Sequence, residues 1–290
     1  MAENIIGFNS YQVLDLLKSG TEYLKIKGVE HPRVEADLIL AHVLEKTRAE
    51  LYLEREREVA LPAVEEYAEF LVRRGNREPL AYLLGKKEFM GLDFFVDQRV
   101  LIPRPETELL VEKVIATVKR RPEQKRWRIL DLGTGSGVLA ISLAYFLPQV
   151  EVTAVDVSKA ALDVACLNAH RLDVKIDFQH GDLFEGLRNK KFDIVVSNPP
   201  YISFKEYYHC APEVKKEPIL ALLGGFDGLS YYRKISDQVA EFLNPKGLLF
   251  LEIGCSQGRD VADLFERRGF KTKVIPDYAG LDRILQAEKE

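Results

Sequence analysis

Ile129-Leu130-Asp131-Leu132-Gly133-Thr134-Gly135-Ser136-Gly137 is the stretch that decides the fold of this chain. Its apolar beginning predicts a buried strand, and the glycines that follow predict a turn whose backbone can approach a ligand closely. Residues 138–144 are apolar and small, as in a helix packed on a sheet. A strand, a glycine-rich turn and a helix in this order predict the first unit of a doubly wound, mainly parallel sheet.

Strand-like and helical runs continue to alternate on both sides of this unit. We expect an α/β fold, a Rossmann-like sheet of seven mainly parallel strands. A different pattern, with apolar residues at helical spacing, covers residues 10–84 and predicts a bundle of four or five helices. The expected domains are 1–84 for the helical bundle, 85–106 for a hairpin or linker with Gly91 near its turn, and 107–290 for the catalytic part. The strand candidates are 128–132, 152–155, 174–178, 192–196, 248–253, 272–275 and 283–285.

Composition and charge narrow the possible functions. The 290 residues carry a net charge of -4, so we expect no general attraction to nucleic acid. Cys166, Cys210 and Cys255 are scattered, a spacing that indicates neither a disulfide framework nor a metal site. The first eight residues lack the pattern of a secretory signal, and no apolar run is long enough to span a membrane. We therefore expect a cytoplasmic protein.

Two carboxylates indicate what the glycine-rich turn binds. Asp156 ends the second strand about twenty residues after the turn, where a carboxylate can hold ribose hydroxyls. Asp131, beside the turn, would repel a pyrophosphate but could pair with an ammonium group. A dinucleotide dehydrogenase stays open because residues 135–140 fit G-x-G-x-x-G/A, although S-adenosylmethionine is the favoured cofactor. Asp182 follows the third strand and could accept a hydrogen bond from an adenine amine.

Asn198-Pro199-Pro200-Tyr201 follows a second buried strand and predicts a site for a planar amide or amine. The prolines stiffen the loop and donate no hydrogen bonds. The Asn198 side-chain oxygen and the Pro199 carbonyl could accept the two N–H groups of a primary amide, while Tyr201 sandwiches its flat face. Positioning and polarisation would then dominate catalysis, without a strong general base.

These motifs and several others together resemble the HemK/PrmC family, the S-adenosylmethionine-dependent methyltransferases that modify the glutamine of the Gly-Gly-Gln motif in class 1 peptide chain release factors. The resemblance implies a class I S-adenosylmethionine-dependent methyltransferase that acts on the glutamine N5, with an N-terminal helical domain that helps to dock the release factor. By motif, the cofactor would contact Gly133, Thr134, Gly135, Ser136, Gly137, Asp156, Leu183 and Asn198, and the substrate glutamine would lie against Asn198, Pro199, Pro200 and Tyr201. The stretches that carry the resemblance are 85–91, 101–108, 131–137, 197–202, 217–218 with 221–222, 225–229, 251–254 with Gln257, and 280–283.

Two other interpretations remain open at the level of sequence. Adenine presents an exocyclic amine of the same planar geometry, so an adenine-N6 DNA or RNA methyltransferase would use the same asparagine, although it would need a basic surface for base extrusion. A non-enzymatic adaptor would bind the cofactor without turnover.

Overall fold

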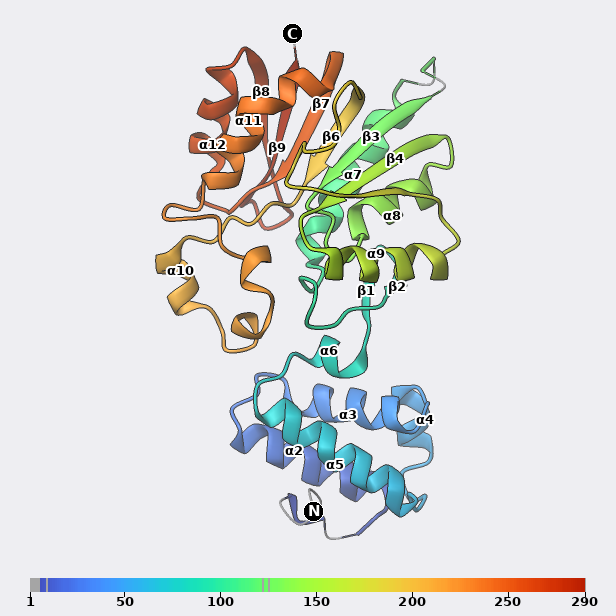
Figure 1. The fold of residues 1–290 in the computed structure, drawn as a ribbon. Helices are drawn as coiled ribbons and strands as arrows, with labels where there is room; N and C mark the ends of the chain where they lie inside the picture. The colour runs from blue at the N-terminus through green and yellow to red at the C-terminus, as the bar shows by residue number, and fades with distance from the viewer. Residues whose placement is uncertain (1–5, 9, 122, 125, 290) are drawn as a thin grey trace. The chain divides into compact units, whose positions relative to one another are not determined.

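The computed structural model describes residues 6–8, 10–121, 123–124 and 126–289, which form two compact units (Figure 1). One unit comprises Met1–Gly85 with Pro212–Lys216, and the other comprises Lys86–Ala211 with Glu217–Glu290. The first five residues, part of the expected bundle and of the segment without a signal pattern, lie outside the described residues. Within the described ranges, no helix is both long enough and apolar enough to cross a membrane.

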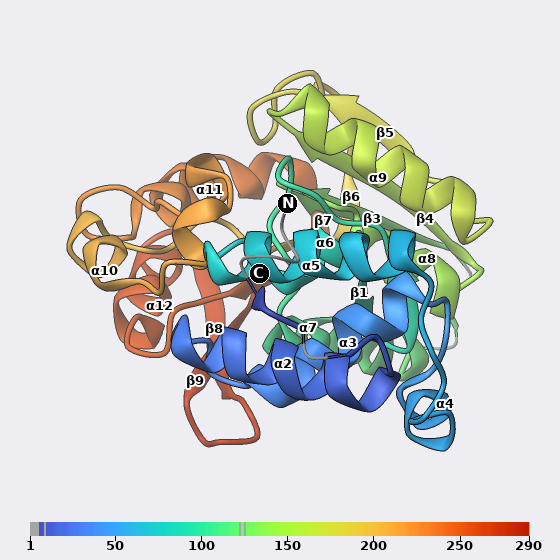
Figure 2. The same ribbon diagram turned by 90° about the horizontal axis from the view of Figure 1, so that it is seen from below.

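The first unit is helical, as its sequence pattern predicts. Helices α2, α3 and α5 pack side by side around buried leucine and isoleucine side chains, with Tyr67 fully buried between them (Figures 1 and 2). Pro32 and Pro62 lie in the first turns of α3 and α5, where a missing N–H costs no intrahelical bond. The helices are α2 (Val13–Ile26), α3 (Pro32–Val43), α4 (Arg48–Leu53), α5 (Leu61–Gly75) and α6 (Leu80–Leu84).

A short segment from much later in the chain belongs to this helical unit. Arg74, only 4% exposed, donates to Glu35 and to Glu213, and Arg77 lies 3.2 Å from Glu213. Glu213 lies just before the 3₁₀ turn η1 (Val214–Lys216). The sequence-based division had assigned this segment to the catalytic part, because ion pairs between residues so far apart leave no local signature.

The second unit is built on a sheet of order β5-β4-β3-β6-β7-β9-β8 (Figure 1). The pairs among β5, β4, β3, β6 and β7 are parallel, whereas β9 is antiparallel to both of its neighbours. The predicted seven-stranded, mainly parallel sheet is therefore confirmed. Its strands are β3 (Trp127–Leu132), β4 (Val150–Asp156), β5 (Asp177–His180), β6 (Phe192–Ser197), β7 (Leu243–Glu252), β8 (Phe270–Pro276) and β9 (Asp282–Lys289).

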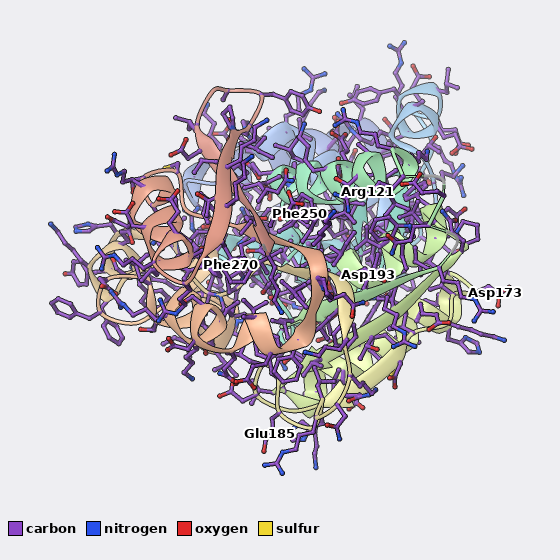
Figure 3. All side chains as sticks on the ribbon, turned by 90° about the horizontal axis from the view of Figure 1, so that it is seen from above. Arg121, Asp173, Glu185, Asp193, Phe250 and Phe270 are labelled. Atoms are coloured by element: carbon purple, nitrogen blue, oxygen red, sulfur yellow. The ribbon has the colours of Figure 1, made fainter. Side chains whose placement is uncertain are left out.

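Helices cover both faces of this sheet because successive side chains of a strand point to opposite sides. In β7, Leu248 and Phe250 join the core beneath α7 and α8, whereas Leu249 and Leu251 join the core beneath α11 and α12. Figure 3 shows Phe250 in the interior and Glu185 at the periphery. The unit contains α7 (Pro105–Lys119), α8 (Val138–Phe146), α9 (Lys159–Arg171), α10 (Phe204–His209), η2 (Ile219–Ala221), α11 (Ser230–Phe242) and α12 (Gly258–Glu266).

A hairpin of β1 (Lys87–Phe89) and β2 (Leu92–Phe94) precedes this sheet. Met90 and Gly91 form its two-residue turn with φ of 54° and 74°, which is the backbone that tight hairpins require. The predicted turn at Gly91 is confirmed. Both strands belong to the second unit, so part of the expected linker 85–106 contributes to the core of the catalytic part.

The predicted strand limits differ from the observed ones where tertiary contacts decide them. The run 174–178 begins too early, because the Val174 N–H bonds the Ala169 carbonyl and closes α9, so that β5 starts at Asp177. The run 283–285 is too short, because β9 pairs with β7 as far as Glu288 and with β8 as far as Lys289. In both cases the hydrogen-bond partner lies outside the segment being interpreted.

Candidate cofactor and substrate site

A cavity of about 130 Å³, partly open to solvent, lies at the carboxyl ends of β3, β4 and β6. The strand order reverses between β3 and β6, and this is where open α/β sheets bind ligands. Predicted site residues that line the cavity are Gly133, Gly135, Asp156, Asp182, Leu183, Asn198, Pro199 and Pro200.

The glycine-rich loop wraps around the end of the neighbouring strand. Gly133 and Thr134 donate their backbone N–H groups to the Val155 carbonyl, at 2.8 and 3.0 Å. Gly133 and Gly135 have φ of 69° and 56°, and a Cβ on either would meet no atom within 4 Å. Gly137 begins α8 with φ of 86°, and a Cβ there would lie 2.7 Å from Ile141. The first two glycines therefore leave open space beside the cavity, and the third permits helix packing.

Asp131 lies beneath the loop and does not line the cavity. Its side chain is fully buried, and its Oδ2 accepts from the Thr134 hydroxyl at 2.7 Å and from the Ala140 N–H at 3.3 Å. Burial raises the pKa of Asp131 to about 7. Thr134 and Ser136 are buried as well, at 5% and 3% exposure. The expected pairing of Asp131 with a cofactor ammonium stays a prediction, and the contacts observed brace the turn from below.

Asp156 connects the loop to the second strand. Its two carboxylate oxygens accept from the Gly135 and Ser158 N–H groups, each at 2.8 Å. Burial raises its pKa, while these bonds act in the opposite direction. A carboxylate has about four acceptor positions, so capacity for two ribose hydroxyls remains. The residues at this end of the cavity thus fit a nucleoside.

Asp182 and Leu183 border the same cavity after β5. Leu183 is 9% exposed and has φ of 53°, and the Asp182 carboxylate lies 3.4 Å from the Lys234 ammonium. Tyr231 lines the cavity nearby, with Lys234 over its ring. Apolar, aromatic and carboxylate groups therefore meet where an adenine ring is expected.

Asn198 faces the cavity from the end of β6. Its Nδ2 donates to the Thr107 hydroxyl at 3.2 Å. No hydrogen bond among the described residues reaches Asn198 Oδ1 or the Pro199 carbonyl. Ser197 Oγ bonds the Leu132 carbonyl at 2.7 Å and joins the ends of β6 and β3. The two predicted acceptors thus lie beside the nucleoside half of the cavity.

Tyr201 lies apart from the cavity lining. Its ring packs against the core on the α11 side of the sheet, and its hydroxyl lies 3.4 Å from Glu252 Oε1. The structure thus gives the ring and the hydroxyl of Tyr201 partners within the protein, and the expected stacking of Tyr201 on a substrate amide stays a prediction.

Glycines after η2 hold the backbone of this loop. A Cβ on Gly228 would lie 2.3 Å from the Tyr201 carbonyl, and one on Gly224 would lie 2.6 Å from the Pro200 carbonyl. Gln257 also donates to the Tyr201 carbonyl at 3.0 Å. The asparagine loop is thus fixed by segments that follow it in the chain.

Glu217 joins two walls of the cavity. Its carboxylate accepts from the Ile102 N–H at 2.9 Å and from Arg104 at 2.5 Å. Val100 and Leu101 line the cavity just before these contacts, and Pro218 lines it just after Glu217. This bond explains physically why two motifs far apart in the sequence belong to one site.

Sequence reasoning missed several residues of the cavity wall, namely Arg99, Val100, Leu101, Val157, Ser158, Ala161, Tyr231 and Leu220. Most are apolar or small, so nothing distinguishes them locally from core residues. Position alone could have indicated Val157 and Ser158, because they follow Asp156 directly. Thr107 bonds Asn198, and Glu252 bonds Tyr201. Both lie within stretches that carry the family resemblance, 101–108 and 251–254, but the sequence assigned them no catalytic or binding role.

Comparisons with known proteins agree with this geometry. The model of the methyltransferase small domain matches residues 105–214, and the model of the PrmC N-terminal domain matches residues 15–85. Among solved structures, a methyltransferase from Pyrococcus furiosus is similar with a TM-score of 0.50 and 21% identity, covering 70% of this chain and 91% of its own. The catalytic domain of hMettl16 gives a TM-score of 0.54 and 17% identity, with 76% and 81% covered. These structures show a shared fold.

Fold, glycine loop and cavity together define a class I S-adenosylmethionine-dependent methyltransferase. A release factor glutamine methyltransferase of Moorella thermoacetica is 44% identical over 264 residues, covering 90% of this chain and 92% of the relative. One of Geobacter sulfurreducens is 40% identical over 265 residues, covering 91% and 92%. The chain belongs to the release factor glutamine methyltransferase family, as its motifs predict.

Proposed function

We propose that this protein transfers the methyl group of S-adenosylmethionine to the side-chain amide nitrogen, N5, of the glutamine in the Gly-Gly-Gln motif of class 1 peptide chain release factors. One observation carries the proposal: Asn198, whose carboxamide oxygen accepts from no described residue, lines the same cavity as Gly133, Gly135 and Asp156. The curated relatives carry the name of this activity.

The cofactor half of the cavity would hold S-adenosylmethionine through named groups. We assign the ribose to Asp156, the adenine to Asp182 and Leu183, and the methionine portion to the backbone of Gly133 and Gly135. When bound, the cofactor supplies an electrophilic methyl group on a sulfonium. Leu132 and Leu183, which line the cavity, would give the bound cofactor an apolar wall.

The transfer half would bind the target amide by its hydrogens. An amide nitrogen is a weak nucleophile because its lone pair is delocalised into the carbonyl. Asn198 Oδ1 and the Pro199 carbonyl would each accept one N–H, orienting the amide and raising electron density on nitrogen. Held in this way, the nitrogen would be placed to take the methyl carbon as its bond to sulfur breaks. Its extra proton then leaves to an acceptor or to water, and a neutral thioether remains.

The helical unit would contribute to recognition of the protein substrate. Its match to the PrmC N-terminal domain over residues 15–85 supports a docking role specific to this family. The proposal also places the protein in the cytoplasm, where release factors act. Cys166, Cys210 and Cys255 are free thiols in the structure, which suits a reducing compartment.

The decisive experiment offers radiolabelled S-adenosylmethionine with a purified class 1 release factor, with DNA and with RNA in separate reactions. We expect label on the release factor, located by mass spectrometry on the glutamine of Gly-Gly-Gln. A release factor with asparagine in place of that glutamine is the matched control and should take up no label. Label on nucleic acid alone would contradict the proposal and favour the adenine-modifying alternative.

A further inference from the structure

A buried hydrogen-bond chain runs from Asn198 into the protein, through Thr107 to Glu252. Asn198 Nδ2 donates to Thr107 Oγ1 at 3.2 Å, and Thr107 Oγ1 donates to Glu252 Oε2 at 2.6 Å. Thr107 is 2% exposed and Glu252 is 1% exposed. The three residues come from the loop after β6, the first turn of α7 and the end of β7.

The hydrogen atoms available to Thr107 and Glu252 determine which group donates and which accepts in each of these hydrogen bonds. A carboxylate only accepts hydrogen bonds, and a threonine hydroxyl has a single hydrogen. Because Glu252 takes that hydrogen, Thr107 can only accept from its other neighbour. The neighbour must therefore be the amide nitrogen of Asn198, since an amide oxygen would face a lone pair. Asn198 Oδ1 is left as the end of the carboxamide that can serve the cavity.

We propose that Glu252, acting through Thr107, is a positioning residue that sets which end of the Asn198 carboxamide serves the substrate. This inference rests on the proposed function, because the orientation matters only if Asn198 Oδ1 accepts from the target amide. A flipped carboxamide would present two N–H groups to a substrate that also presents N–H groups. The repulsion would remove an acceptor needed in the transition state.

The surroundings of Glu252 support the role. Tyr201 donates its hydroxyl to the second oxygen, the positive charge of Arg283 lies near, and Glu106 opposes them with its negative charge. Burial is the largest influence and raises the pKa of Glu252 to about 7. A proton on Oε2 would make the carboxyl a donor toward Thr107, which could then donate to Asn198 Oδ1. The active orientation thus requires the ionised carboxylate.

Two substitutions at Thr107 separate this role from simple packing. Thr107→Val keeps the shape of the side chain and removes the hydroxyl, whereas Thr107→Ser keeps the hydroxyl and removes a methyl group. With release factor as substrate, we expect Thr107→Val to lower kcat about tenfold or more, and Thr107→Ser to retain kcat within about threefold. Dissociation constants for S-adenosylmethionine, from calorimetry, should change much less. A kcat for Thr107→Val equal to or above that of Thr107→Ser would overturn the inference.

A measurement on the protein without substrate makes the test independent of activity. In protein labelled with ¹⁵N-asparagine, the side-chain amide signals of Asn198 should shift as the pH passes from 6 to 8 in the wild type. They should not shift in Glu252→Gln, which cannot ionise. At pH 8, side-chain amide signals of Asn198 that are the same in the wild type and in Glu252→Gln would overturn the inference even if the variants of Thr107 failed to fold. Lack of wild-type methylation of the release factor would instead refute the proposed function.

Discussion

The two halves of the cavity are held in different ways. The glycine loop is held by residues at most 32 positions away, since Asp131 bonds Thr134 and Ala140, Asp156 bonds Gly135, and Asn168 bonds Ser136. The asparagine loop is held from a distance, because its hydrogen bonds reach Thr107, Glu252 and Gln257. A local sequence motif can therefore predict the glycine loop together with several of the residues that hold it. The second half needs most of the catalytic unit to be folded around it.

The largest expected effect tests the reactive end of the second half. Asn198→Ala removes an acceptor that would act on the amide in the transition state, so we expect kcat to fall about a hundredfold or more, equivalent to about 3 kcal/mol in the barrier. Steady-state assays with release factor measure it. Cofactor affinity should fall far less, since Gly133, Gly135 and Asp156 lie elsewhere on the wall. A loss below tenfold would remove Asn198 from the role assigned to it.

The next-largest effect concerns Asp131, whose hydrogen bonds support the glycine loop. Asp131 holds a proton in the native state up to about pH 7, whereas an aspartate in the unfolded chain loses it near pH 4. The native state binds more protons across that window, so stability falls as pH rises from about 4 to about 7. Asp131→Asn cannot titrate. Between pH 5 and pH 8, we expect the free energy of unfolding of the wild type to fall by roughly 2 kcal/mol more than that of Asp131→Asn.

Urea denaturation at the two pH values measures this change. The pKa of Glu252 is raised as well, so the stability of Asp131→Asn should still depend on pH to some extent. That dependence should become weaker when Glu252→Gln is added. Equal loss of stability in the wild type and in Asp131→Asn between pH 5 and pH 8 would show that Asp131 is already ionised in the folded protein.

Sequence predicted most where contacts are local. Strand β3, the glycine turn and α8 follow from one continuous stretch. The limits of β5 and β9 could not be found, because a helix end and two neighbouring strands decide them. The chain from Asn198 to Glu252 was beyond reach for the same reason. Its bonds join residues 91 and 145 positions apart.

The smallest expected effect tests whether distant backbone contacts truly hold the asparagine loop. Gly228 has φ of 76°, and a Cβ there would lie 2.3 Å from the Tyr201 carbonyl, so Gly228→Ala must displace backbone. We expect kcat to fall about tenfold because the loop shifts relative to the cofactor. Gly269→Ala is the matched control, since Gly269 has φ of 81° but open space around the added Cβ.

Both substitutions carry the strain of a left-handed residue, about 1 kcal/mol in stability, which thermal unfolding measures. Only Gly228→Ala adds a steric clash beside the site. The difference in kcat between the two variants therefore measures the effect of displacing the asparagine loop. Because the atoms nearest to a Cβ on Gly228 belong to Tyr201 and Gln257, and none to the glycine loop, cofactor affinity should stay similar in both. If Gly228→Ala instead weakened cofactor binding as much as kcat, the two halves would be mechanically coupled, and the distinction between locally and distantly supported halves would fail.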